Sequence, residues 1–475
     1  MLGLFLSVGL LSGCDGDQGP DPSQTEDLRG PVAIDRSLRI AGTRLGELAG
    51  SAVAGDFDLN GDGQADVAVG AMLGDNKHDG GGRACVFLGR LKHDLTLPES
   101  LVCLHGQAEN HLFGRDVEGL GDLNGDGFDE LGIGAVHHDE GGANSGMVSV
   151  VWGEADPSEP AQTEVYGTDP GGHVGLRFTR LPGDLPRFAV GGHETILDAE
   201  DADELRGEGV VWIVSEPPSE RKVPISDVAL RWTGEREDDR LGVTVASPGD
   251  VDGDGLADLL VGASQARRSD DGPQVGAVYL LLSPFEAGGS ASDADGVVFG
   301  EHDLAWFGWA VAGLEDIDGD GLADFAASAF KDGANGPDAG AVYVFSGAPA
   351  PDTDPSMAIA TLLGEWEGDK AGEVLEPGGD LDGDGRAELL VGAPTASHRR
   401  TWGGAVYAVR GPFEGLRSLG DQDALWVGVQ DLQFTGSSLA RAGDVAGTPD
   451  PDLIVGAMGD TTSTGAAFLL TQVLW

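Results

Sequence analysis

Short apolar runs separated by glycine and acidic residues recur along almost the whole chain. Segments 259–261 and 405–409 are examples, and runs of this length suit strands and are too short to span a membrane. Helical periodicity is absent, because apolar residues do not recur at intervals of three and four. The pattern therefore predicts an all-β protein whose strands are bounded by Gly and Asp turns.

One acidic phrase recurs between a small apolar segment and a continuous apolar run, most clearly as GDVDGDGLADLLVGA at 249–263. The first aspartates of its seven copies are Asp58, Asp122, Asp184, Asp250, Asp316, Asp380 and Asp444. These positions give a nearly constant period of about 62–66 residues, the signature of a repeat architecture. Each period adds a run of the GAVYLL type and a last apolar run, which makes four strands. Seven four-stranded units predict a seven-bladed β-propeller.

The two ends of the chain predict how the ring closes. Segment 38–40 matches the fourth strand of the later repeats, whereas the sequence stops at Trp475, just after the third strand of the last repeat. We therefore expect segment 38–40 to complete blade seven, so that the last blade is closed by an N-terminal strand and no edge stays exposed. Residues 37–475 are assigned to the propeller.

Five acidic loops place side-chain oxygens at loop positions 1, 3, 5 and 9. These residues are Asp58, Asn60, Asp62 and Asp66; Asp122, Asn124, Asp126 and Glu130; Asp250, Asp252, Asp254 and Asp258; Asp316, Asp318, Asp320 and Asp324; and Asp380, Asp382, Asp384 and Glu388. Position 6 is always glycine, which permits a positive φ. Position 7 varies, as expected of a ligand that uses only its backbone carbonyl: Gln64, Phe128, Leu256, Leu322 and Arg386.

Hard oxygen donors at alternate residues around a glycine turn are typical of a Ca²⁺ loop, and Mg²⁺ or Zn²⁺ fits less well. An EF-hand is excluded, because position 12 carries Val69, Ile133, Val261, Ala327 or Val391 and the flanks are strand-like. The chain is therefore expected to bind about five Ca²⁺ ions. Blade three, shortened to Asp184-Leu185-Pro186, should bind none, and blade seven has Ala446 and Thr448 at ligand positions.

The repeat resembles the FG-GAP repeat of integrin α-subunit propellers and their bacterial relatives. Phe113-Gly114 and Phe307-Gly308 match the "FG" of that repeat, and 392–394 reads Gly-Ala-Pro. The resemblance covers about residues 37–475. It implies a seven-bladed propeller with Ca²⁺ in loops on its lower face and a role in adhesion to a protein or glycan.

The formal charge of −53, from 28 Lys+Arg against 81 Asp+Glu, argues against nucleic acid and anionic membrane surfaces as partners. At the N-terminus, the apolar run 2–11 ends in Leu11-Ser12-Gly13-Cys14, which resembles a bacterial lipobox. Residues 1–14 are therefore expected to be a lipoprotein signal peptide with Cys14 lipidated, and 15–36 a flexible acidic tether. A cleaved secretory signal or an uncleaved apolar N-terminus are the alternatives. The first two place the protein outside the cytoplasm, and lipidation would anchor it in the cell envelope.

Cys85 and Cys103 lie in neighbouring strand-like runs. A disulfide between them is compatible with export, but two small buried side chains would give the same sequence. The sequence leaves both alternatives open, because it does not give the Cα separation that a disulfide requires.

The sequence contains no nucleophile elbow, zinc-binding helix motif or Walker loop. The loops expected opposite the calcium loops carry aromatic and basic residues of the kind that binding hot spots favour: Trp306, Trp366, Trp402, Arg399 and Arg400. We therefore expect a monomeric, surface-anchored binding or adhesion module without enzymatic activity. The alternatives are a propeller-scaffold enzyme acting on polysaccharide, or a structural subunit of an envelope complex.

Overall fold

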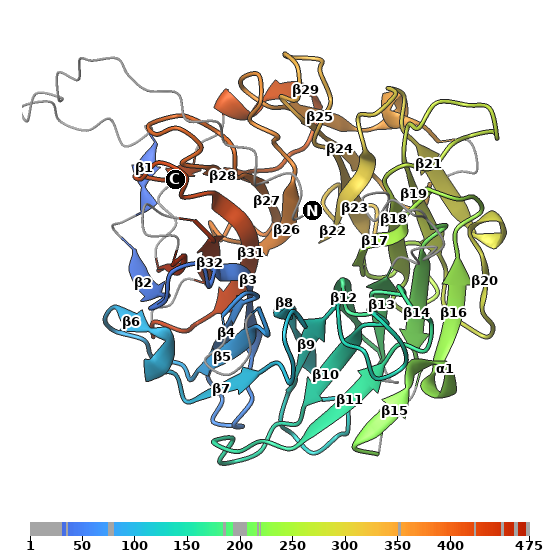
Figure 1. The fold of residues 1–475 in the computed structure, drawn as a ribbon. Helices are drawn as coiled ribbons and strands as arrows, with labels where there is room; N and C mark the ends of the chain where they lie inside the picture. The colour runs from blue at the N-terminus through green and yellow to red at the C-terminus, as the bar shows by residue number, and fades with distance from the viewer. Residues whose placement is uncertain are drawn as a thin grey trace, which may run out of the picture.

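Seven β-sheets are arranged radially around a central axis in the computed structural model (Figure 1). The structure describes residues 31–34, 37–74, 80–183, 187–192, 207–215, 218, 220–349, 353–421, 424–447, 451–459 and 464–471. The first strand of each repeat is innermost and the fourth lies towards the rim. The seven-bladed propeller expected from the repeat is therefore confirmed.

Each repeat forms one blade, whose four strands follow one another from the axis outwards. Blade one contains β3 (Ala49–Phe57), β4 (Asp66–Ala71), β5 (Arg83–Phe87) and β7 (Val102–His105). Blade two contains β8 (Phe113–Gly121), β9 (Glu130–Ala135), β10 (Met147–Val151) and β11 (Gln162–Tyr166). Blade three contains β12 (Arg177–Leu181), β13 (Arg187–Gly192), β14 (Val210–Val214) and β16 (Ala229–Thr233). Blade four contains β17 (Leu241–Ala246), β18 (Leu259–Ala263), β19 (Ala277–Leu281) and β21 (Gly296–Phe299).

The remaining three blades follow the same plan. Blade five contains β22 (Phe307–Glu315), β23 (Asp324–Ala329), β24 (Ala341–Phe345) and β25 (Ala360–Leu363). Blade six contains β26 (Val374–Gly379), β27 (Glu388–Ala393), β28 (Ala405–Val409) and β30 (Ala424–Val427). Blade seven contains β31 (Thr435–Gly443), β32 (Asp452–Ala457), β33 (Ala466–Leu470) and, from the other end of the chain, β2 (Leu38–Ala41).

The N-terminal segment closes the ring as predicted. Strand β2 runs antiparallel to β33, with Ile40 opposite Ala467. The structure also corrects the predicted tether, because β1 (Val32–Ala33) pairs with β30 of blade six and Ile34 is fully buried. The fold therefore begins inside the segment assigned to the tether. The predicted signal peptide with Cys14, and residues 15–30 of the predicted tether, lie outside the described residues.

A fifth strand at the outer edge of five blades was not predicted. Four of these strands come from the connection between the third and fourth strands of the following blade, whereas β1 precedes β2, the fourth strand of blade seven, in the N-terminal segment; all five pair in parallel. These strands are β6 (Leu95–Thr96) on β2, β15 (Lys222–Pro224) on β11, β20 (Gly289–Ser290) on β16, β29 (Gly415–Ser418) on β25, and β1 on β30. In blade four, Thr353 forms a single parallel bridge with Val298.

A short helical turn follows most of these edge segments. The turns are η3 (Leu97–Glu99), α1 (Ile225–Val228), η4 (Ala291–Asp293), η5 (Pro355–Met357) and η6 (Leu419–Asp421). No helix in the described part of the chain is both long and apolar enough to cross a membrane.

The core lies between neighbouring blades, and this explains the continuous apolar runs. The second and third strands are covered on both faces, so every residue of β4, β9 and β27 is buried. The glycine of the FG pair lets the next blade approach closely. Gly308 has φ +76°, and a Cβ there would lie 2.2 Å from the carbonyl oxygen of Ala277, so only glycine fits.

Cys85 on β5 and Cys103 on β7 are direct neighbours across the ladder, with Cα atoms 4.1 Å apart, and a disulfide joins them. Of the two alternatives that the sequence leaves open, the structure contains the disulfide. It links the two outer strands of blade one.

Candidate metal centres and the opposite face

The five acidic loops join the first strand of a blade to the second, so they all lie on one face of the propeller, which we call the metal-loop face. The connections between second and third strands, and between one blade and the next, lie on the other face, which we call the opposite face. The topology therefore separates the predicted metal ligands from the predicted partner-binding residues.

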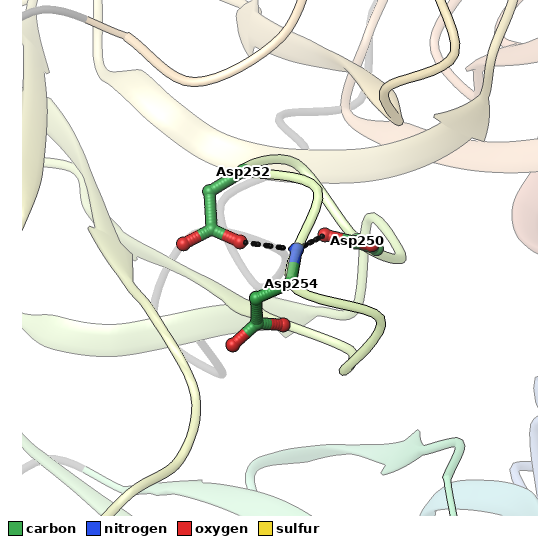
Figure 2. A group of neighbouring side chains, drawn as sticks. All are labelled: Asp250, Asp252 and Asp254. Carbon is green, nitrogen blue, oxygen red and sulfur yellow. Dashed lines mark hydrogen bonds between the residues drawn. The ribbon is translucent and has the colours of Figure 1, made fainter.

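The loop of blade four curls around the carboxylate at its first position. Asp250 accepts hydrogen bonds from the backbone N–H groups of Gly253 (2.6 Å), Asp254 (3.1 Å) and Gly255 (2.7 Å). Asp252 also accepts from the Asp254 N–H at 3.1 Å, so Asp250, Asp252 and Asp254 surround one turn of backbone (Figure 2). Oxygens of the three carboxylates lie within 4.8 Å of one another.

The other four loops repeat this arrangement. The first-position aspartates Asp58, Asp122, Asp316 and Asp380 each accept from the N–H of the glycine at position 6, over 2.7–2.9 Å. The position 5 carboxylate accepts from the N–H of position 7 in every loop, at Gln64, Phe128, Leu256, Leu322 and Arg386. The variable side chain at position 7 is therefore attached to a fixed backbone.

The loops also contain a glycine at position 4, to which no role was assigned from the sequence. Gly253 and Gly255 have φ of +83° and +87°, and the same two positions have positive φ in the other four loops. The glycine is visible in the sequence as the fourth letter of the D-x-D-G-D-G pattern. It is needed because any L-residue would be strained at the positive φ of either position.

The carboxylate at position 9 differs from the others because it is fully buried. None of the five has exposed surface: Asp66, Glu130, Asp324 and Glu388 begin the second strands of their blades, and Asp258 directly precedes β18. Each accepts from the N–H of loop position 2, as Asp258 does from Val251 at 2.9 Å. Burial raises the pKa of Asp66, Glu130 and Glu388 to about 7 and of Asp258 to about 6. A cation in the loop would offset the free-energy cost of burying these carboxylates in their charged form.

The residues present fit a divalent cation. The Oε1 atom of Glu388 is buried and has no hydrogen-bond partner among the described residues, although a buried carboxylate oxygen normally has one. Oxygens of Glu388, Asp380 and Asp382 lie within 4.8 Å of one another. All donors are hard oxygens, which suits Ca²⁺. Similar three-carboxylate clusters occur in blades four and five, whereas blades one and two have an asparagine at position 3.

Blade six has a basic side chain at its loop that the sequence did not indicate. The Nε atom of Arg410, just after β28, lies 2.8 Å from Oδ2 of Asp382. The equivalent residue of blade five is Ser346, whose hydroxyl donates to Asp318 over 2.7 Å. A guanidinium group at a ligand carboxylate competes with a cation, whereas a hydroxyl does not.

We therefore expect the blade-six loop to bind calcium more weakly than the blade-five loop, and Arg410→Ser to strengthen it. A partly exposed ion pair contributes up to about 1 kcal/mol, which corresponds to about fivefold in Kd. Calorimetric titration of the full chain and of this variant tests the expectation. Ser346→Arg is the matched converse and should weaken the blade-five site. Unchanged affinities in both variants would contradict the role given to Arg410.

Two loops were expected not to bind metal. Residues 184–186 of blade three lie outside the described residues, as does Thr448 of blade seven. In blade seven, Asp452 keeps the buried position and accepts from the N–H groups of Val445 (2.9 Å) and Ala446 (2.8 Å), while Asp444 is exposed. Ala446 offers no side-chain oxygen, so weak or absent metal binding stays the prediction for this loop.

On the opposite face, two of the three predicted partner-binding tryptophans are largely exposed. Trp366 and Trp402 keep 51% and 40% of their surface accessible. Trp306 is half-buried instead, because it packs against Trp309 and Phe330, and the Lys331 ammonium lies 3.7 Å from its ring centroid. Trp306 therefore belongs to a packed cluster of aromatic rings.

The two predicted arginines bind backbone carbonyls. Arg399 donates to the carbonyl of Pro31 over 2.6 Å, and Arg400 donates to the carbonyl of Val429 over 3.1 Å. Arg399 thus also fastens the start of the N-terminal segment to blade six. Both side chains are exposed.

A buried polar network supports Trp366. The ring packs edge-on against His398, with centroids 4.7 Å apart. Nε2 of His398 lies 2.8 Å from the hydroxyl of Tyr407, which donates to Glu365 over 3.1 Å. Burial lowers the pKa of His398, so the imidazole is neutral near pH 7. Tyr407 is fully buried, so these groups position the tryptophan from beneath.

Comparison with known proteins supports the repeat assignment. A model described as "FG-GAP repeat" matches residues 49–87, 242–281, 307–345 and 371–409. These are the first three strands of blades one, four, five and six.

Three relatives illustrate the similarity. The chain is 36% identical to integrin alpha-PS2 of Drosophila melanogaster over 168 residues, 34% of this chain and 12% of the relative. It is 31% identical to integrin alpha-V of Gallus gallus and 30% identical to integrin alpha-X of Homo sapiens, each over 234 residues. These matches cover 48% and 47% of this chain but only 21% and 18% of the relatives. The chain thus corresponds to a small part of each integrin subunit.

Among solved structures, the crystal structure of BBS1N in complex with ARL6DN, soaked with lead, matches with a TM-score of 0.44 and 10% identity over 94% of this chain and 98% of that chain. This similarity is too low to bear on fold or function. The repeat matches, the integrin relatives and the seven radial sheets agree with one another. The chain is therefore an FG-GAP repeat β-propeller.

Proposed function

We propose that this protein is an exported, calcium-stabilised β-propeller that binds a protein or glycan partner through its opposite face. Export and attachment through a lipid on Cys14 rest on the N-terminal sequence. The similarity to integrin α-subunits over the repeats supports the binding role.

Calcium has a scaffolding role in this proposal. The five loops would hold the ions through the side chains at positions 1, 3, 5 and 9 and the backbone carbonyl at position 7. Bound Ca²⁺ supplies positive charge that offsets the repulsion between the carboxylates of each loop. All five loops lie on the metal-loop face, so the ions would not take part directly in binding on the opposite face.

The observation that carries the proposed binding role is the distribution of exposed apolar side chains. Of the nine exposed large hydrophobics in the described part of the chain, five lie in connections of the opposite face: Leu45, Leu304, Trp366, Trp402 and Leu432. Exposed tryptophans are favoured at binding hot spots and stack on both sugar rings and apolar side chains. Trp366 lies in the connection from blade five to blade six, and Trp402 lies in the connection between the second and third strands of blade six.

Binding through these tryptophans is tested with the full chain on an array of glycans and immobilised envelope proteins, in calcium-containing buffer. We expect Trp366→Ser with Trp402→Ser to weaken any specific signal by about tenfold or more, because a hot-spot tryptophan contributes at least about 1–2 kcal/mol. Met357→Ser on the outer rim, which removes another exposed apolar side chain, is the matched control and should bind normally. Equal binding by both variants would contradict the proposed surface.

An enzymatic role is the second candidate. The Glu365–His398–Tyr407 network is the group of potential acid–base residues nearest the exposed tryptophans, but only 6% of the His398 side chain is accessible and Tyr407 is fully buried. A general base must reach its substrate. The burial of this network therefore favours a binding module over a polysaccharide-degrading enzyme.

A further inference from the structure

The outer edge of blade one differs from those of the other blades. Five sheets have a parallel fifth strand, and blade four has the Thr353 bridge in its place. Strand β7 of blade one pairs with β5 on one side, and no strand in the described part of the chain is added to the sheet on its other side. Figure 1 shows β7 at the outer rim of the propeller.

The lengths of the connections explain this difference. The connection between third and fourth strands is equally long in blades one, three, four, five and six: 88–101, 215–228, 282–295, 346–359 and 410–423. In blade two it is shorter and spans only 152–161. It also follows another path, because the Glu154 N–H donates to the carbonyl of Leu59 in the acidic loop of blade one. It therefore adds no strand to β7.

The backbone of β7 presents hydrogen-bonding groups at this edge. The Gly106 N–H donates to the carbonyl of Gly82 over 2.9 Å, which makes Gly82 and Gly106 a hydrogen-bonded pair. Hydrogen-bonded and non-hydrogen-bonded pairs alternate along an antiparallel ladder, so Cys85 and Cys103 form a non-hydrogen-bonded pair. Their short Cα separation of 4.1 Å agrees with this register. The backbone N–H and C=O of Cys103 therefore point away from β5, towards the rim.

The disulfide holds β7 in place without an outer neighbour. In the blades with a fifth strand, the fourth strand is hydrogen-bonded on both sides. In blade one, the bond between Cys85 and Cys103 attaches the fourth strand covalently to the third. The blade that lacks the added strand is thus the blade whose outer strand is covalently fixed, and a fixed edge is a preformed template for strand addition.

We propose that the outer edge of blade one is a docking site for an extended segment of a partner protein, which adds to β7 as a parallel fifth strand. This site lies on the rim and is separate from the binding role proposed for the opposite face. Strand addition uses main-chain hydrogen bonds for affinity and side-chain pockets for specificity.

The chain's own added segments indicate the chemistry of the partner segment. Four of them contain a shared five-residue pattern, in which the third residue is apolar or small and the fifth is a carboxylate. These are LTLPE at 95–99, VPISD at 223–227, GSASD at 289–293 and RSLGD at 417–421. The third residue of each is buried: Leu97, Ile225, Ala291 and Leu419. In two of them the acid closes the turn: Glu99 accepts from the Thr96 N–H and Asp293 from the Ser290 N–H. The partner should carry the same pattern.

The probe is a labelled peptide with the sequence of residues 221–228, RKVPISDV, which includes the segment that pairs with blade two. It is added to the oxidised full chain, and amide hydrogen exchange is measured along β7. We expect saturable binding. At a peptide concentration about ten times its Kd, exchange at the rim-facing amide of Cys103 should slow by about tenfold, because only peptide-free molecules exchange.

Two controls distinguish binding of the peptide through main-chain hydrogen bonds to β7 from binding through its side chains alone. The same peptide with N-methyl groups on alternate residues keeps its side chains but loses its donors, and it should not bind. Replacing residues 152–161 with the longer connection 215–228 should give blade one its own fifth strand and abolish peptide binding.

The proposal is overturned if the peptide protects no amide of β7, or if it protects the outer strands of the other blades equally. Protection of β7 that rises with protein concentration in the absence of peptide would also overturn it. A second copy of the chain would then occupy the edge, and sedimentation would show the dimer. Failure of this site would leave the tryptophan test on the opposite face unaffected.

Discussion

Removing calcium should lower the free energy of unfolding by roughly 7 kcal/mol. At ~1 mM Ca²⁺ and a Kd of ~0.1 mM, each site adds about 1.4 kcal/mol, and five sites are expected. Without the ion, the exposed carboxylates of each loop repel one another, and the buried carboxylate at position 9 loses its counter-charge. For a chain of this size, the change corresponds to a melting temperature about 8 °C lower.

Differential scanning calorimetry with calcium and with EGTA measures this effect. Asp250→Ala should remove one site, so the difference between the two melts should shrink by about one fifth. Asp271→Asn, which removes an exposed carboxylate outside the loops, should leave the difference unchanged. Magnesium at the same concentration should restore little of the lost stability, because it retains its own waters and needs fewer carboxylates. Identical melts with and without EGTA would refute the calcium assignment.

The blade plan could be predicted from the sequence because it is periodic. A period of about 62–66 residues, with strand-length apolar runs at fixed places in it, leaves few alternatives to a propeller. The closing strand was also predictable, because segment 38–40 resembles a fourth strand that the last repeat lacks. The fifth strands were not predictable. A pair such as Leu95 and Thr96 is too short for a hydrophobic pattern, and its partner β2 belongs to a different repeat.

The metal loops show the same division between local and long-range information. The ligands at positions 1, 3, 5 and 9 could be assigned because they all lie within one short loop. Arg410 could not be assigned to the blade-six loop from the sequence. It lies far from Asp382 along the chain, and the ion pair exists only because β28 returns to the metal-loop face beside this loop. The start of the fold at Val32 was missed for a similar reason, since its partner is Trp426.

Deleting residues 1–41 should destabilise the propeller severely. The deletion removes β1 from blade six and β2 from blade seven, together with the buried side chains of Ile34 and Ile40. Taking about 2–5 kcal/mol for each buried isoleucine, the loss is roughly 4–10 kcal/mol. That is comparable to the total stability of many domains, and the deletion also exposes the edge of β33 to other chains. We expect a much lower melting temperature and a lower yield of soluble protein.

A circular permutant provides the decisive control for this deletion. Residues 31–41 are moved to follow residue 475 through a Gly-Ser linker. Leu470 is then followed by residues 471–475, the linker and residues 31–37 before β2 begins at Leu38. The resulting connection is as long as the corresponding one in blades one, three, four, five and six. The permutant should recover the stability of the full chain, because each strand reaches its partner through a connection of the usual length.

A variant of the permutant tests whether stability depends on the buried isoleucine side chains or only on the presence of an added segment. The same permutant carrying Ile34→Ser and Ile40→Ser adds an equally long segment but buries hydroxyl groups in place of apolar side chains. It should therefore melt as low as the deletion. If this variant were as stable as the unmodified permutant, the two isoleucines would not be what fastens the ring. If the deletion melted at the temperature of the full chain, blade seven would not need its N-terminal strand, and closure would depend only on the contacts of β31, β32 and β33 with blade one.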